Sequence, residues 1–168
     1  LEDPSSWPDL KEGALRAGDL VASLGGSFFL LVDGFITGDV GSRADPKERL
    51  AESDWNRLIE TTHKVAELAH DRLGLQLAFH PCADTHVQFE DQIEAFLEET
   101  DPKRVSLCLD TGHHAYRGGD PVSFMRKHHE RIPYLHLKAV DAALQKRVND
   151  ENIPIAEAVK MGVMCEPD

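Results

Sequence analysis

The sequence predicts an α/β fold in which helices pack around a parallel β-sheet. Short apolar segments alternate along the chain with longer segments of helical periodicity. Each apolar segment is largely hydrophobic at consecutive positions, as strands buried on both faces are. The predicted strands lead into Asp33, His80, Asp110 and His136, so polar side chains are expected to gather at one edge of the sheet.

Composition limits both the domain count and the partners. The chain has 168 residues and is 41% hydrophobic, which is enough for one core and one domain. Its formal charge of -12 disfavours nucleic-acid and anionic-membrane partners, and no apolar run reaches the ~20 residues that span a bilayer. We therefore expect a cytoplasmic protein that binds a small molecule. A homo-oligomer is compatible with this composition. The three widely spaced cysteines are expected to be reduced thiols.

The first half of the chain predicts two helices around one strand. Apolar residues recur at roughly helical spacing over residues 9–24, before the stop signal Gly25-Gly26. A buried strand is expected over residues 27–32 and a long polar loop over residues 35–51. A second helix is expected from a Ser53 N-cap to about Gly74.

The second half repeats the same unit. Strands are expected over residues 75–79, 105–109 and 134–137, and helices over residues 89–99 and 121–128. Asp120-Pro121 gives the last of these helices a cap followed by proline at its first position. A doubly wound sheet and a closed barrel both fit this order, and both place active sites at the carboxyl ends of their strands.

The side-chain period of the last two strands favours the barrel. A period of two puts Ser106, Cys108 and Asp110 on one face, and likewise Tyr134, His136 and Lys138. The intervening leucines, at positions 107, 109, 135 and 137, are then expected to face the helices. Small and polar side chains on a common face are typical of a barrel interior with a site at its mouth.

The strand-end residues predict a metal site. Imidazole and carboxylate donors from His80, Asp110 and His136 suit an open, catalytic divalent ion such as Mn²⁺, Co²⁺ or Zn²⁺, and Mg²⁺ is a further candidate. Such an ion can polarise a carbonyl and a neighbouring hydroxyl and stabilise an enediolate, the intermediate of sugar isomerisation, epimerisation and keto-cyclitol dehydration. Taken alone, Asp110 fits a simple Asx-turn about equally well.

Four further residues are candidates for contact with the substrate. His113 suits proton transfer, because the pKa of histidine lies in the useful range, and Lys138 suits oxyanion charge. Asp84 and His86 lie in the polar loop after the His80 strand and could bind substrate hydroxyls, although an ordinary loop explains them equally well.

The segment from Phe79 to Asp141 contains three specific motifs: LDTGH, the GGDP after it, and HLK, 26 residues beyond Asp110. With these motifs the segment resembles the sugar phosphate isomerase/epimerase family of xylose isomerase-like (β/α)8 TIM barrels. Within the family the chain is most similar to the inosose dehydratases, in which a segment like NIPIAEAVKMGVM follows HLK. The resemblance implies a divalent-metal enzyme that removes water from 2-keto-myo-inositol; a sugar or sugar phosphate isomerase or epimerase is the alternative within the family.

The resemblance also assigns roles. Asp110 and His136 match the family's metal ligands, His113 matches a substrate-side histidine, and His80 stands where a glutamate ligand is common. Residues 1–168 would form a single partial barrel domain, truncated at both ends, that covers the fourth to seventh βα units. A fourth ligand, a glutamate of the eighth strand, would then lie outside the chain.

Two other hypotheses about the function remain. The same fold includes DNA-cleaving enzymes with three metals, but the strong negative charge counts against DNA binding. A non-catalytic metabolite-binding barrel is the other reading, and Cys82, at the place of a second family histidine, supports it.

Overall fold

The computed structural model describes residues 1–36 and 49–167, and most of the loop predicted over residues 35–51 lies outside them. In chain order, the first elements are a 3-10 turn η1 (Pro4–Ser6), α1 (Trp7–Ser23), β1 (Phe28–Val32), α2 (Glu52–Glu67), a π-helical turn η2 (Leu68–Arg72), β2 (Gln76–His80) and α3 (Glu90–Glu99). They are followed by β3 (Val105–Asp110), α4 (Thr111–Tyr116), α5 (Pro121–His128), η3 (His129–Arg131), β4 (Tyr134–His136), β5 (Ala139–Val140), α6 (Ala142–Asp150), α7 (Ile155–Lys160) and β6 (Met164–Cys165).

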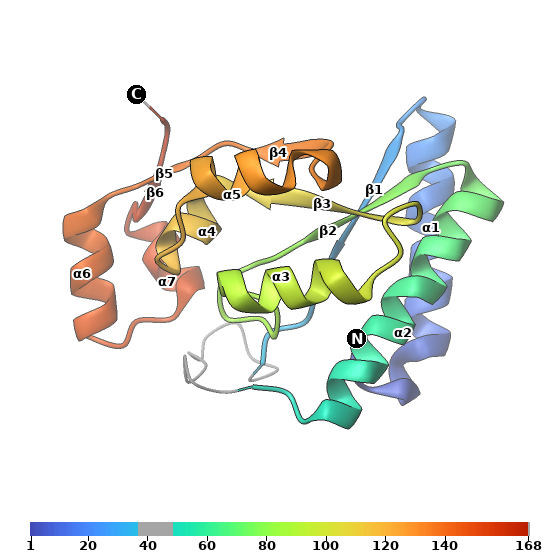
Figure 1. Cartoon of the computed structure of the whole chain (residues 1–168), viewed down its shortest axis with the longest axis horizontal. Coiled ribbons are helices and arrows are strands. Elements are labelled where there is room, and N and C mark those ends of the chain that lie inside the picture. Colours follow the sequence, from blue (N-terminus) through green and yellow to red (C-terminus); the bar gives the residue numbers. More distant parts are fainter. Residues whose placement is uncertain (37–48, 168) are drawn as a thin grey trace.

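Four parallel strands form the main sheet in the order β1-β2-β3-β4, as the alternating pattern predicts (Figure 1). The sheet is strongly curled. In a flat sheet β1 and β4 would lie about 14 Å apart at the usual strand spacing, yet the rings of Phe28 in β1 and Tyr134 in β4 have centroids 5.4 Å apart. This curvature is that of part of a barrel, and it decides between the two architectures that the sequence allows.

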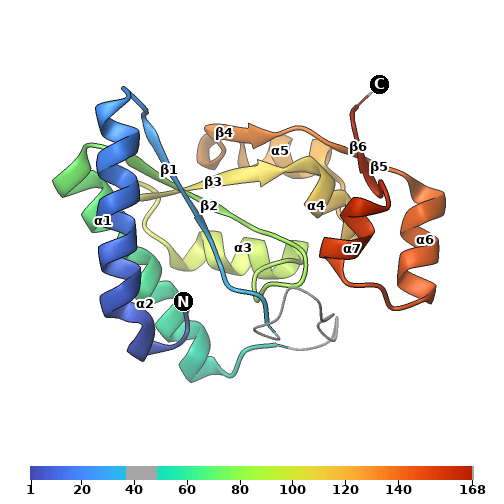
Figure 2. The same cartoon turned by 180° about the vertical axis from the view of Figure 1, so that it is seen from behind.

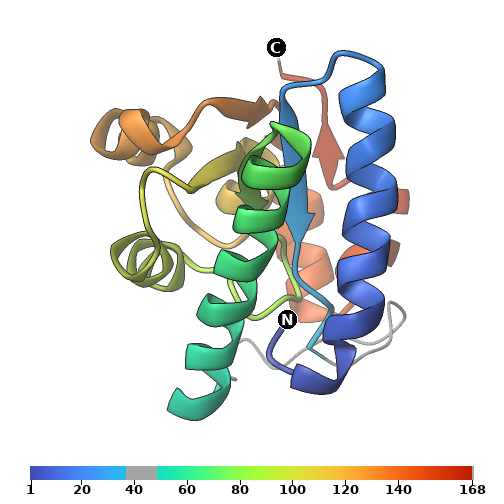
Figure 3. The ribbon, with the colours of Figure 1, turned by 90° about the vertical axis from the view of Figure 1, so that its right-hand side faces the viewer.

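Helices cover the outer face of the curled sheet. α1 and α2 lie side by side next to β1 (Figures 1 and 3), and α2, α3 and α5 contribute buried side chains to one core with the strands. Phe79 of β2 stacks on Phe96 of α3 at 4.1 Å between centroids. The largest fully buried members of this core include Leu58, Leu77, Phe79, Ile93, Phe96, Leu107, Leu109 and Phe124.

A second, smaller core forms where the chain continues beyond β4. α6 and α7 group at the end of the molecule opposite α1 (Figure 2). Their Val148, Ile155 and Ala158 pack with Ala83 and Tyr116. β5 and β6 pair antiparallel beside them, and these four elements were not predicted from the sequence.

Two local expectations are corrected. α2 begins at Glu52 with Ala51 at its N-cap, so Ser53 lies inside the first turn. Leu135 and Leu137 do not face helices, being 39% and 64% exposed. The reason is that β4 is the last strand of the main sheet, and the next helix, α6, packs in the second core instead of over β4.

Among the described residues, no helix combines the length and apolar character needed to cross a membrane.

Candidate metal centre at the strand ends

Asp110, the last residue of β3, is the centre of the predicted site. Its Oδ2 lies 3.3 Å from His80 Nε2 and 3.4 Å from His136 Nδ1, and it accepts a hydrogen bond from Lys138 Nζ. The neighbouring strands β2 and β4 end at His80 and His136, so the ladder itself brings the three side chains together. The structure therefore brings three of the predicted site residues, His80, His136 and Lys138, to one carboxylate oxygen of a fourth, Asp110.

Hydrogen bonds and close packing of the LDTGH segment fix this arrangement. Asp110 is both the end of β3 and the N-cap of α4, and its Oδ1 accepts the N–H of His113 at 3.0 Å. Thr111 Oγ1 donates to the Lys138 carbonyl at 2.7 Å and accepts from the Lys138 N–H at 2.9 Å. Gly112 leaves room for Lys138, because a Cβ at this position would lie 2.7 Å from Lys138 Cβ. Thr111 and Gly112 were not predicted as site residues, since the sequence does not show that they lie against Lys138.

His113 points from α4 toward the loop after β2. Its Nδ1 accepts the N–H of Ala83 at 3.2 Å, and the Sγ of Cys82 lies 3.5 Å from its Nε2. Its ring meets that of His80 edge to face, with centroids 5.6 Å apart. The pKa of His113 is lowered to about 4, chiefly by burial; the Asp110 charge opposes this, and the nearby His80 and Lys138 add to the lowering. His113 is therefore neutral at physiological pH.

The electrostatics of the centre favour an ionised Asp110. Burial opposes its ionisation, but hydrogen bonds from His80, Lys138 and the His113 N–H outweigh burial, so the pKa of Asp110 lies well below its ordinary value. Burial, with smaller contributions from His80 and Lys138, lowers the pKa of His136. An ionised carboxylate beside two imidazoles is a donor set suited to a divalent cation.

A second observation supports a divalent metal at this donor set. His80 is 6% exposed, and its Nδ1 is buried without a hydrogen-bond partner in the described chain. One ring nitrogen of His80, one of His136 and the Sγ of Cys108 also lie within 4.8 Å of one another. Cys108 is fully buried on the face of β3 that carries Asp110, and burial, followed by the Asp110 charge, raises its pKa to about 12.

A pocket of about 450 Å³ adjoins this centre. His113 and Lys138, the two predicted catalytic residues, line it together with Leu137 and the segment Met164–Glu166. The pocket is large enough for a small polyol.

Asp84 and His86, predicted to contact substrate, are held by partners of their own. Asp84 is buried, pairs with Arg117 at 2.5 Å, and accepts the N–H of Ile155 at the start of α7 at 2.9 Å. His86 Nδ1 lies 2.7 Å from Oδ2 of the buried Asp33. Burial opposes protonation of His86, but this hydrogen bond and the charges of Asp33 and Glu2 together outweigh burial and raise the pKa of His86.

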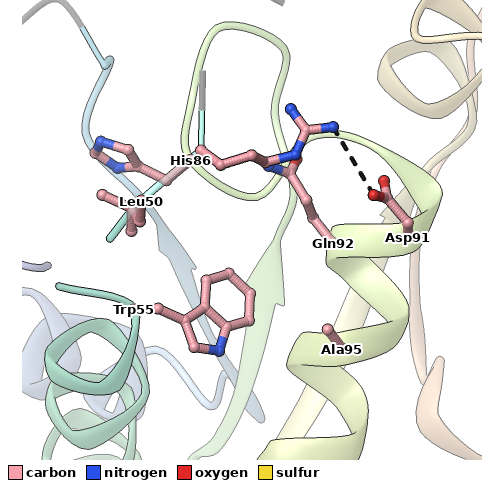
Figure 4. Close-up of a pocket in the computed structure, with 7 residues that line it drawn as sticks. Leu50, Trp55, His86, Asp91, Gln92 and Ala95 are labelled. Carbon is pink, nitrogen blue, oxygen red and sulfur yellow. Dashed lines mark ion pairs between the residues drawn. The ribbon is translucent and has the colours of Figure 1, made fainter. Parts of the chain in front are cut away.

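His86 also lines a separate pocket of about 190 Å³ between the first turns of α2 and α3 (Figure 4). Trp55 and Gln92 line the same space, and an ion pair of 3.8 Å joins Arg49 to Asp91 across its rim. A substrate-binding role for Asp84 and His86 stays a prediction.

Known proteins match most of the chain. The family model described as "Xylose isomerase-like TIM barrel" matches residues 3–164. The inosose dehydratase of Geobacillus thermodenitrificans (strain NG80-2) is 36% identical over 123 residues, which are 73% of this chain and 41% of that protein. The chain thus spans less than half the length of the curated relatives that it matches.

Solved structures share the fold. The probable 3-DHS dehydratase AsbF from Bacillus anthracis superimposes with a TM-score of 0.69 at 15% identity, over 86% of this chain and 49% of that one. The IOLI protein, solved with a bound zinc atom, superimposes with a TM-score of 0.63 at 12% identity, over 83% and 47% of the two chains.

Proposed function

Because the chain belongs to the xylose isomerase-like TIM-barrel family, we propose that it carries the metal centre of a lyase that removes water from a keto-cyclitol, with 2-keto-myo-inositol as the substrate. The 36% identity to an inosose dehydratase supports this substrate over an open-chain sugar. The zinc atom of the IOLI protein supports a divalent cation at the strand ends.

One structural observation carries the proposal. His80, His136 and Lys138 converge on a single oxygen of Asp110 at the carboxyl ends of three adjacent strands, where barrel enzymes place their chemistry. Two imidazoles and an ammonium around one buried carboxylate at the strand ends are typical of a functional site in a barrel.

Asp110, His80 and His136 would hold the cation. When bound, a divalent ion supplies Lewis-acid stabilisation of negative charge on a substrate carbonyl oxygen. Mn²⁺, Co²⁺, Zn²⁺ and Mg²⁺ are all candidates for this chain.

His113 and Lys138 would act on the substrate from the wall of the adjoining pocket. The Ala83 N–H occupies Nδ1 of His113, so the neutral ring carries its proton on Nε2 and can donate it in a hydrogen bond to a substrate oxygen. The Lys138 ammonium can stabilise negative charge that develops on a substrate oxygen.

The Asp110→Asn substitution tests the proposal. Asparagine is also a good N-cap, so α4 should still form, whereas the charged metal ligand is lost. We expect the Mn²⁺ content of protein loaded with Mn²⁺ and the dehydration of 2-keto-myo-inositol to fall together, measured by elemental analysis and by product formation.

Asp120→Asn is the matched control, because Asp120 caps α5 in the same way with its side chain in solvent-exposed contacts. Unchanged metal content and activity in Asp110→Asn would contradict the proposal. Inversion of a sugar carbon without loss of water, in the wild-type protein, would redirect it to an epimerase.

A further inference from the structure

Cys108 lies one strand period below Asp110, on the same inward face of β3. Its side chain is fully buried, and its Sγ is within 4.8 Å of a ring nitrogen of both His80 and His136. Free cysteine often serves only as a small apolar residue in a core. Here, however, its neighbours are two metal-binding side chains, one of which has a buried nitrogen without a partner in the described chain.

The two histidines therefore belong to two overlapping donor sets. One set adds the Asp110 carboxylate and the other adds the Cys108 thiol. Lys138 distinguishes them, because its ammonium contacts Asp110 Oδ2 and competes there with an incoming cation. Cys108, His80 and His136 form a set that does not include the carboxylate contacted by this ammonium.

We propose that Cys108 is the metal-selecting residue of this centre: its thiolate joins His80 and His136 around a thiophilic cation such as Zn²⁺, Cd²⁺ or Co²⁺, whereas Mn²⁺ and Mg²⁺ use Asp110 in its place. The assignment rests on the proposed function for the existence of the centre and adds its selectivity. Thiolate ligands favour the first group of ions, and carboxylate oxygens favour the second. On binding, the S–H bond breaks, the proton passes to solvent and a metal–sulfur bond forms.

The three cysteines of the chain allow a matched test in the intact protein. Cys108→Ser, Cys82→Ser and Cys165→Ser are each titrated with Co²⁺, and a sulfur-to-cobalt charge-transfer band is followed in the near ultraviolet. We expect the band in wild type and in the Cys82 and Cys165 variants, and its loss in Cys108→Ser. Loss of this ligand should weaken Zn²⁺ binding by at least the roughly 10–100-fold that outer-shell substitutions cost, while Mn²⁺ affinity changes little.

Folding is checked separately, because Cys108 is buried. Circular dichroism of Cys108→Ser and of the apolar Cys108→Ala must match wild type. A band that is absent in wild type, a band that survives in both Cys108 variants, or equal loss of Zn²⁺ and Mn²⁺ affinity in folded variants would overturn the assignment.

Failure of this inference differs from failure of the proposed function. Wild-type protein that binds Mn²⁺ and dehydrates the keto-cyclitol but shows no cobalt–sulfur band refutes only the role of Cys108. A cobalt–sulfur band together with unchanged activity in Asp110→Asn refutes the proposed function and leaves Cys108 as a ligand.

Discussion

Lys138 depends on the absence of a side chain at Gly112. In Gly112→Ala the added Cβ would meet Lys138 Cβ, which is fixed to the backbone and has no freedom to turn away. Such overpacking costs about 1–3 kcal/mol of folding free energy. We expect the displaced ammonium to lower kcat strongly, with a fall in thermal stability that differential scanning fluorimetry measures.

Gly13→Ala provides the contrasting substitution. Gly13 lies inside α1, and a Cβ there meets nothing within 4 Å. Alanine should therefore stabilise the protein by about 0.5–1 kcal/mol without changing kcat. Equal behaviour of the two alanine variants would contradict a specific role for Gly112.

Thr111 holds the end of the HLK segment through its hydroxyl. Thr111→Val keeps the shape of the side chain but removes both of its hydrogen bonds to the Lys138 backbone. The Lys138 carbonyl and N–H then lose these partners. We expect a loss of about 1–3 kcal/mol in urea unfolding. Thr111→Ser should restore most of it, and a serine variant as unstable as the valine variant would argue against the hydrogen bonds.

Sequence periodicity predicts the residues of the metal centre better than the residues that pack around it. His80, Asp110, His136 and Lys138 follow from strand ends and a period of two, because neighbouring strands share one edge. The contacts of Thr111 and of Arg117 could not be predicted, since each reaches a segment that is distant in sequence.

At the scale of elements, α4 shows why a helix can be missed. TGHHAY contains glycine and two histidines, which are poor helix formers, and it follows the strand without a linker. The helix forms because Asp110 caps it and Tyr116 is buried in the second core. Tertiary contacts thus override weak local propensity.

His114, inside α4, should make stability depend on pH. Its ring is buried against Phe124, with centroids 4.9 Å apart, and burial lowers its pKa below 6.5 although Glu90 and Asp120 oppose this. Below about pH 6.5 the unfolded chain then binds a proton that the folded chain does not, so stability falls as pH falls.

Urea unfolding at about pH 5 and about pH 8 measures this effect. We expect His114→Gln to lose less stability on acidification than wild type does, because the titrating ring is gone. An identical loss in both proteins would show that His114 does not contribute.

At the scale of the molecule, the Asp84–Arg117 pair joins the segments that follow β2 and α4 to α7. Asp84 lies in the loop after β2, Arg117 follows α4, and the second carboxylate oxygen of Asp84 accepts from the first residue of α7. Asp84 has a φ of 65°, which asparagine also tolerates, so Asp84→Asn changes charge without straining the backbone. Removing one partner of a buried pair costs about 3–5 kcal/mol, and we expect that loss in urea unfolding.

The same variant tests the predicted contact between Asp84 and substrate. A raised KM with unchanged stability would favour substrate binding, whereas lost stability with an unchanged KM would favour the structural pair. Asn152→Gly offers a control at another residue with positive φ, 54°, where glycine should be tolerated.

The direct junction between β3 and α4 restricts how this protein can diverge. One residue inserted before Asp110 would turn its carboxylate to the helical side of the sheet, and one inserted after it would separate the carboxylate from the His113 N–H. Natural variants should therefore differ in length in the connections that follow β1, β2 and β4, and keep a constant count from residue 105 to residue 113.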